Sequence, residues 1–204
     1  MPDSLVSDVI ISGGGLVGQT LAIALAQHGL TSSIVDPADP LASIAPDFDG
    51  RATAIASATW RMFGVLGLAE RLAPHVCPIR QIWVSDALRP GELDFAPSAD
   101  DDALGQMVEN RQLRLALAER VRGEPLIRLL APAQVTAQDR GAHGVVLTLA
   151  DGTQVKAPLL VVAEGRRSPT RDAAGFAIAN WSYHHHALIG AFSHEKPHDN
   201  VAYE

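Results

Sequence analysis

The apolar residues near the start of the chain follow two different periods. Residues 5–11 form a short, β-branched apolar run, which is typical of a strand buried on both faces. A glycine-rich turn at residues 13–18 comes next, followed by a stretch with helical spacing and a second apolar run at residues 32–35. This pattern predicts a βαβ unit, which implies a parallel sheet and a right-handed crossover.

The helix of this unit is expected to have one apolar face and a defined end. Its predicted apolar face consists of Val17, Leu21, Ala24 and Leu25. His28 and Gly29 then place a basic side chain in the last turn and a glycine at the stop, as helix C-termini commonly do.

The rest of the chain alternates between helical and extended patterns. The expected elements begin with a helix at 52–72, a strand at 79–85 with which 92–95 can pair, and a helix at 110–122 capped by Asn110. Strands are then expected at 127–130, 145–149 and 159–163, with a hairpin turn at Asp151-Gly152. A short helix between Ser168 and Gly175 and an extended last stretch of about 25 residues complete the chain.

Composition and charge exclude several classes of function. The formal net charge of −7 gives no general attraction to nucleic acid or to anionic lipid. Cys77 is the single cysteine, so no disulfide framework is expected and a reducing compartment is favoured. The N-terminus lacks the pattern of a signal peptide, and no apolar run approaches the ~20 residues that span a bilayer.

The glycine-rich turn has the spacing of a dinucleotide-binding motif. Gly13, Gly15 and Gly18 follow a strand and open a helix, with Leu16 and Val17 between the last two. The glycines permit a tight turn, close approach of a pyrophosphate, and close packing of helix on strand. The N–H groups of the helix start would then face the phosphates. A purely structural glycine turn is the alternative.

Asp36 lies 18 residues past Gly18, at the end of the second predicted strand. A carboxylate in this place can accept two hydrogen bonds from an adenosine ribose, and it would repel a 2′-phosphate. The alternative is a solvated turn aspartate before Pro37.

Two arginines precede or open predicted helices, where a cation is locally unfavourable. Arg51 stands just before the helix predicted at 52–72, and Arg111 stands in the first turn of the helix at 110–122. Such placement suggests a bound anion nearby, for which a pyrophosphate is suited. A surface arginine whose stem packs on its helix is the alternative for Arg111.

A second joint between strand and helix carries another acid. Glu164 follows the strand at 159–163 directly, and Ser168 caps the next helix. An acid at the carboxyl end of a parallel strand is well placed to bind a sugar hydroxyl. The alternative is a loop acid paired with Arg166, Arg167 or Arg171.

Metal binding is disfavoured. The run of three histidines at 184–186 would point to opposite faces of a strand and could not ligate one ion together. The three aspartates at 100–102 are expected to be solvated loop charges. No set of His, Cys and Asp residues has zinc spacing.

Several stretches together resemble the flavin-dependent aromatic hydroxylases that share the para-hydroxybenzoate hydroxylase fold, above all their ubiquinone-biosynthesis branch. The stretches that carry the resemblance are "DVIISGGGLVG", "DGRATAIA", "ENRQLRLAL", "AEGRRSPTR" and "WSYHHHALIGAFSHEKPHDNVAYE". This chain departs from the family by carrying Glu164 where the family has an aspartate.

The resemblance implies an FAD site. Gly13, Gly15 and Gly18, with Leu16 and Val17, would hold the pyrophosphate, and Asp36 would hold the adenosine ribose. Arg51 and Arg111 would lie along the phosphate and ribityl part, and the backbone of Val135 would contact the adenine. Glu164 would contact the cofactor or the pyridine nucleotide.

The fold implied is α/β, a Rossmann-like FAD/NAD(P)-binding fold of the glutathione-reductase type with part of an interleaved β-sheet substrate domain. The FAD-binding domain would comprise residues 1–75 and 109–178. Strands of the substrate domain would lie at 76–108, and its sheet would begin at 179–204.

The function implied is that of an FAD-dependent monooxygenase that uses NAD(P)H and O2 to hydroxylate an aromatic ring, here a polyprenylated phenol of ubiquinone biosynthesis. Family members are longer, so the chain would be an N-terminal half without a recognisable catalytic acid, base or nucleophile. The expected location is the cytoplasm or the periphery of the inner membrane, with a ubiquinone-biosynthesis complex as a candidate partner.

Two alternatives remain at this stage. The chain can be an inactive remnant that serves as a nucleotide-binding or interaction module. It can also be an NAD-binding dehydrogenase domain, with which Asp36 is compatible, but then Arg51, Arg111 and the second joint have no role.

Overall fold

The computed structural model describes residues 4–45, 51–85, 93–190 and 192–204. The chain divides into two compact units, the first formed by Met1–Pro46 with Arg114–His185 and the second by Asp47–Leu113 with His186–Glu204. Among the described helices, none is long and apolar enough to cross a membrane.

A four-stranded parallel sheet forms the centre of the first unit. Its strands, in spatial order, are β13 (Leu159–Val162), β2 (Val9–Ser12), β3 (Ser32–Val35) and β9 (Ile127–Leu130). β2 pairs with β13 on one side and with β3 on the other. The βαβ unit predicted from the apolar pattern is therefore confirmed, because β2 and β3 are parallel neighbours joined through a helix.

A second four-stranded sheet covers one face of the parallel sheet. Its strands, in spatial order, are β1 (Ser4–Val6), β12 (Gln154–Ala157), β11 (Gly144–Leu149) and β10 (Val135–Gly141). β11 and β12 form an antiparallel hairpin, and Gly152 in its turn has a φ of 87°. The predicted turn at Asp151-Gly152 is thus confirmed.

The apolar run at residues 5–11 is two strands in different sheets, and its prediction as one strand was wrong. Polar contacts of the two residues between β1 and β2 explain the break. The Ser7 N–H donates to the Lys156 carbonyl at 3.1 Å, and Asp8 Oδ2 accepts from the Thr31 N–H at 2.7 Å. The chain therefore leaves the second sheet at Ser7 and enters the parallel sheet at Val9.

The helix α1 (Leu16–Gln27) ends at His28 and Gly29 as expected, but its predicted apolar face was wrong. The buried residues are Gly18, Ala22, Ile23 and Ala26, whereas Val17 is 71% exposed. Apart from Ile23, the buried residues on this side are small, which allows the helix to approach the parallel sheet closely.

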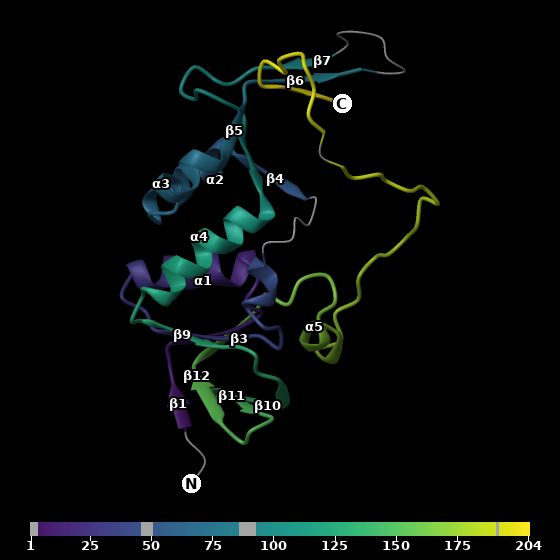
Figure 1. Cartoon of the computed structure of the whole chain (residues 1–204). Coiled ribbons are helices and arrows are strands. Elements are labelled where there is room, and N and C mark those ends of the chain that lie inside the picture. The colour runs from purple at the N-terminus through teal and green to yellow at the C-terminus, as the bar shows by residue number, and fades with distance from the viewer. Residues whose placement is uncertain (1–3, 46–50, 86–92, 191) are drawn as a thin grey trace. The chain divides into compact units, whose positions relative to one another are not determined.

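The main core of the first unit lies between its two sheets. The buried residues of this core are Ile10, Val35, Leu147, Leu149, Val155 and Ala157. Figure 1 shows α1 and the later part of α4 (Asn110–Arg122) on one face of the parallel sheet and β10, β11 and β12 on the other. The short helix α5 (Pro169–Ala173) begins at Ser168, whose side chain accepts from the Arg171 N–H.

In its described residues, the second unit contains two three-stranded sheets and two short helices. The first sheet is β4 (Ala52–Ala56), β8 (Gly105–Glu109) and β5 (Val76–Ile79), and the other is β14 (Val201–Tyr203), β6 (Gln81–Val84) and β7 (Leu93–Phe95). The helices are α2 (Ser57–Val65) and α3 (Ala69–Leu72), and single 3-10 turns lie at Ala42–Ile44 in the first unit and Ala73–His75 in the second.

Two predictions in the second unit need correction. Residues 52–56, expected to be helical, form β4 because they pair in full register with β8, and this pairing overrides the helix propensity of the three alanines. The strand expected at 79–85 is interrupted at Arg80, whose N–H donates to Asn200, so that β5 and β6 enter different sheets. The pairing of β6 with Phe95 is as expected.

Leu147 tests the contribution of the core between the sheets, because it is 1% exposed. Replacing it with alanine removes buried methyl groups and leaves a cavity, so Leu147→Ala should lower the free energy of unfolding by about 2–5 kcal/mol. Leu188→Ala is the matched control, because Leu188 is 99% exposed and should change stability little. Chemical denaturation measures both, and equal losses would contradict this assignment of the core.

Candidate functional site

The turn after β2 contains two glycines, Gly13 and Gly18, at which neighbouring backbone atoms occupy the space that a side chain would need. Gly13 has a φ of 111°, and a Cβ there would collide with the backbone at Ala163, just after β13. A Cβ on Gly18 would collide with the carbonyl oxygen of Gly13. The Gly13 N–H donates to the Val35 carbonyl at 2.8 Å. The turn can therefore form only with glycine at both positions.

The start of α1 has the properties of an anion site. Gly15 is the N-cap residue and provides no side-chain cap, and the first turn contains no acidic residue. A Cβ built on Gly15 would meet no atom within 4 Å, so the space beside it is open. Leu16 and Val17 open the helix, and their N–H groups belong to the first turn, which has no intrahelical acceptors.

Asp36 stands next to this turn, at the end of β3. Its Oδ2 accepts from the Gly14 N–H at 2.5 Å, and its Oδ1 accepts from the Ala38 N–H at 2.7 Å. A carboxylate has about four lone-pair sites. Asp36 can thus hold the turn and still accept two further hydrogen bonds from a ligand.

Val135 begins β10, the outer strand of the second sheet. It pairs with Leu149 of β11, and the register shifts between Val135 and Ala137. No described strand pairs with the opposite edge of β10. Backbone groups on that edge are available to a planar ligand with donors and acceptors along one side.

Glu164 is bonded to residues of three segments, the end of β2, its own loop and the start of α5. Its Oε1 accepts from the hydroxyls of Ser12 at 2.7 Å and Thr170 at 2.6 Å. Its Oε2 accepts from the Ser168 hydroxyl at 2.6 Å and the Thr170 N–H at 3.1 Å. Four donors occupy its four lone-pair sites. The carboxylate therefore ties the second joint together.

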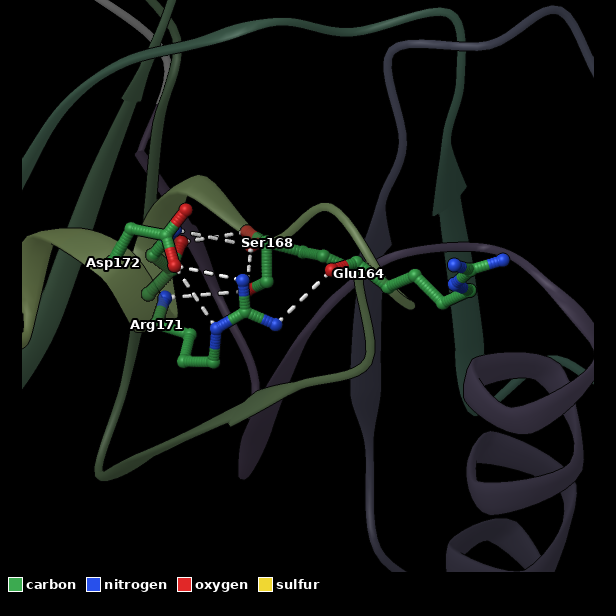
Figure 2. A network of polar contacts seen from close by, with 6 residues as sticks. Glu164, Ser168, Arg171 and Asp172 are labelled. Atoms are coloured by element: carbon green, nitrogen blue, oxygen red, sulfur yellow. Dashed lines mark hydrogen bonds and ion pairs between the residues drawn. The ribbon is translucent and has the colours of Figure 1, made fainter. Parts of the chain in front are cut away.

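Two neighbouring charges at this joint, Arg171 and Asp172, are paired with each other. Figure 2 shows Arg171 and Asp172 beside Ser168 and Glu164. The Arg171 guanidinium donates to Asp172 Oδ1 at 2.7 Å and to the Arg166 carbonyl at 3.1 Å. Of the arginines considered as partners for Glu164, Arg171 is thus bonded to other groups in the described part of the loop.

Partial burial raises the pKa of the Glu164 carboxyl, but the hydrogen bonds from Ser168, Thr170 and Ser12 outweigh it and hold the pKa below its usual value. A carboxyl whose pKa is lowered by folding stabilises the folded state above its unfolded pKa. That stability is lost as the pH falls through the lowered folded-state value.

A cavity of about 630 Å³ in the first unit brings four of the predicted residues together. Gly13, Asp36, Val135 and Glu164 all line it, and its volume is in the range of small-molecule sites. The strands β2, β3 and β13 all present their carboxyl ends here, where open α/β sheets bind ligands.

Ser12, Gln138 and Arg167 are among the further residues that line this cavity, and none of the three was predicted from the sequence to bind a cofactor. Ser12 is the polar residue that ends the apolar strand β2, which is a signal that sequence analysis could have used. Gln138 has a buried amide nitrogen without a partner among the described residues, and Arg167 adds a cation. No sequence pattern distinguishes these last two from ordinary strand and loop residues.

Arg51 and Arg111 belong to the second unit, where the fold brings their backbones close. β4 pairs with β8 in a register that opposes Ala52 and Glu109, and the Asn110 N–H donates to the Arg51 carbonyl at 3.1 Å. The two arginines therefore stand at the same end of this strand pair. Their predicted contact with a cofactor stays a prediction.

The residues considered for metal binding form no such site in the described parts of the chain, where no group of three His, Cys, Asp or Glu side chains gathers. Asp101 pairs with Arg61, and the histidines at 184–186 lie exposed outside any strand.

Glu164→Gln tests the joint. A neutral amide cannot accept four hydrogen bonds, so this substitution should lower the free energy of unfolding by about 1–2 kcal/mol at pH 7. The loss should shrink as the pH falls below the ordinary carboxyl range, because the wild-type carboxylate is then protonated too. Thermal unfolding followed between pH 7 and the acid range measures both.

The matched control for this pH series is Glu195→Gln, which changes an exposed carboxyl in the last described segment. It should leave the unfolding midpoint nearly unchanged at every pH. A Glu164→Gln loss that stays constant from neutral to acid pH would contradict the role of the carboxylate charge.

Sequence comparisons agree with this geometry. The model of the family described as FAD binding domain matches residues 6–197. The ubiquinone hydroxylase UbiL of Rhodospirillum rubrum is 43% identical over 199 residues, covering 98% of this chain and 46% of that protein. The 3-demethoxyubiquinol 3-hydroxylase of Escherichia coli is 30% identical over 179 residues, covering 87% of this chain and 46% of that protein.

A solved structure shares the fold. PqsL from Pseudomonas aeruginosa, described as a probable FAD-dependent monooxygenase, superposes with a TM-score of 0.73 at 21% identity, covering 87% of this chain and 48% of that protein. The chain thus spans about half the length of the relatives it matches. The glycine turn, the acid at the end of β3 and the match over residues 6–197 lead to one conclusion: the chain belongs to the FAD-binding domain family of flavin-dependent monooxygenases.

Proposed function

We propose that this chain is the N-terminal part of an FAD- and NAD(P)H-dependent monooxygenase that hydroxylates the aromatic ring of a polyprenylated phenol in ubiquinone biosynthesis. The observation that carries the proposal is the cavity that gathers Gly13, Asp36 and Val135 at the carboxyl edge of the parallel sheet. The relatives from R. rubrum and E. coli, whose names state ubiquinone-pathway hydroxylation, support the substrate class.

The residues of the cavity, together with the adjoining glycine turn, fit the adenosine and pyrophosphate parts of FAD. The open space at Gly15 and the uncapped start of α1 suit the pyrophosphate. Asp36 keeps two lone-pair sites for the ribose hydroxyls. The unpaired edge of β10 at Val135 suits the adenine. Arg51 and Arg111 are proposed for the phosphate and ribityl part.

Glu164 contributes in a different way from Asp36. Because its carboxylate already accepts four hydrogen bonds, we propose that it supports cofactor binding indirectly. It would do so by holding Ser12 and the start of α5 in place at the cavity wall. Bound FAD would supply the redox chemistry, with NAD(P)H as reductant and O2 as oxidant. The residues of this chain would hold and orient it.

A polyprenylated substrate is insoluble in water, which supports cytoplasmic action at the periphery of the inner membrane or within a ubiquinone-biosynthesis complex. None of the described helices would insert as a span.

The visible absorption spectrum of the chain after incubation with FAD and desalting tests the FAD site. Flavin bands should stay with the protein. Asp36→Asn should lower the affinity for FAD about 10- to 100-fold, because hydrogen bonds to a charged group contribute about 1.5–3 kcal/mol. Asp151→Asn changes an exposed aspartate in the β11–β12 turn and should bind FAD as the wild type does. Equal affinity of the Asp36 variant would remove the ribose assignment.

The alternative function is a nucleotide-binding or interaction module without catalysis. Large exposed apolar side chains favour it, and in the described residues near the C-terminal end they are Phe176, Ile178, Trp181, Tyr183, Leu188, Ile189, Phe192 and Tyr203. Exposed apolar surface on this scale promotes association. Size-exclusion chromatography should show self-association or a bound partner if this function holds, and a clean monomer that retains FAD would argue against it.

A further inference from the structure

Gln19, in the second turn of α1, reaches back to the glycine turn. Its Nε2 donates to the carbonyl oxygen of Gly14 at 2.7 Å. Its Oε1 is buried and has no hydrogen-bond partner among the described residues. The amide orientation is set by the contact itself, because the reverse orientation would place two oxygens against each other. Gln19 is not among the residues that the glycine motif requires.

The bond to Gly14 fixes the direction of a different group. The Gly14 carbonyl and the Gly15 N–H belong to the same peptide unit, which is planar and trans, so the two point in opposite directions. When Gln19 holds the carbonyl on one side, the Gly15 N–H must point to the other side. The space next to Gly15 on the described surface is open.

The preceding peptide is held as well. The Gly14 N–H donates to Asp36 Oδ2 at 2.5 Å. Two consecutive peptides of the turn are therefore oriented by side chains, one by Asp36 from β3 and one by Gln19 from α1. Glycine would otherwise allow either peptide to rotate, because it has the widest conformational freedom of all residues.

We propose that Gln19 is a positioning residue of the phosphate-binding turn: it orients the Gly14–Gly15 peptide so that the Gly15 N–H faces a bound pyrophosphate. The proposal rests on the proposed FAD site. It assigns to Gln19 no contact with the ligand, and it explains why a half-buried glutamine occupies the helix start next to the glycines.

Stability alone does not explain this glutamine. A buried acceptor without a partner costs stability, and this cost offsets part of what the bond to the Gly14 carbonyl contributes. Gln19 also lines a smaller cavity of about 200 Å³ with Gly14, Gly15, Asp36 and Arg114, so the site has room for a side chain of similar length. A role in orienting the turn accounts for the presence of a glutamine at position 19, which packing does not explain.

The test compares ligands with and without a pyrophosphate in the 204-residue chain and in Gln19→Met. Calorimetry should show ADP and FAD binding about tenfold more weakly to the variant, the effect expected for one lost hydrogen bond to an anion. Adenosine, which has no phosphate, should bind to both proteins with the same affinity. The melting temperature without ligand should stay the same or rise.

Two further variants sharpen the test. Gln19→Asn keeps the amide but is too short by one methylene to reach Gly14, and it should reproduce the selective loss of ADP even where methionine disturbs folding. Gln27→Met makes the same chemical change at the other end of α1 and should bind ADP as the wild type does.

Each outcome decides between the proposals. A wild-type chain that binds ADP, with variants that bind it equally well, overturns the role of Gln19 and leaves the FAD site intact. Equal weakening of ADP and adenosine together with a lower melting temperature shows a merely structural role and also overturns it. A wild-type chain that binds neither ADP nor FAD removes the proposed function itself, and the role of Gln19 with it.

Discussion

The carbonyl oxygen of Gly13 fills the space that a side chain at position 18 would need, and this contact sets the geometry of the whole first unit. It brings α1 against β2 so closely that the sheet-facing side of the helix consists mainly of glycine and alanine. The same turn passes against the backbone that follows β13. A single backbone crossing thus fixes the distance of helix from sheet and the place where two strand ends meet.

The two acids at these strand ends show how hydrogen-bond capacity separates binding from support. Asp36 accepts hydrogen bonds from two backbone N–H groups, whereas Glu164 accepts four, from three side-chain hydroxyls and one backbone N–H. The extra methylene of glutamate lets the second carboxylate reach across to Ser12. Its charge is satisfied inside the protein, whereas Asp36 retains capacity for a ligand.

Elements of the fold could be predicted from the sequence where the pattern that specifies them lies within a few neighbouring residues. The glycine spacing, the acid after β3 and the cap at Ser168 are local, and α1, β3 and α5 lie where they were expected. The pairing of β4 with β8 joins residues about 50 positions apart, so its alanines were misread as helix. The face of α1 was misread because the helix packs closely on the sheet mainly through small residues, which carry a weaker apolar signal than Val17, Leu21 and Leu25.

The candidate site shows the same limit. Gly13, Asp36 and Glu164 line one cavity because parallel strands present their carboxyl ends at one edge. Val135 joins them from the start of β10 in the second sheet, which the βαβ unit does not imply. Gln19 carries no such signal, because its effect passes through a peptide unit whose orientation no residue pattern reports. Side chains that hold the backbone of a turn decide where its N–H groups point. A motif defined by glycines alone therefore describes the space for a phosphate and leaves the direction of the donors to its neighbours.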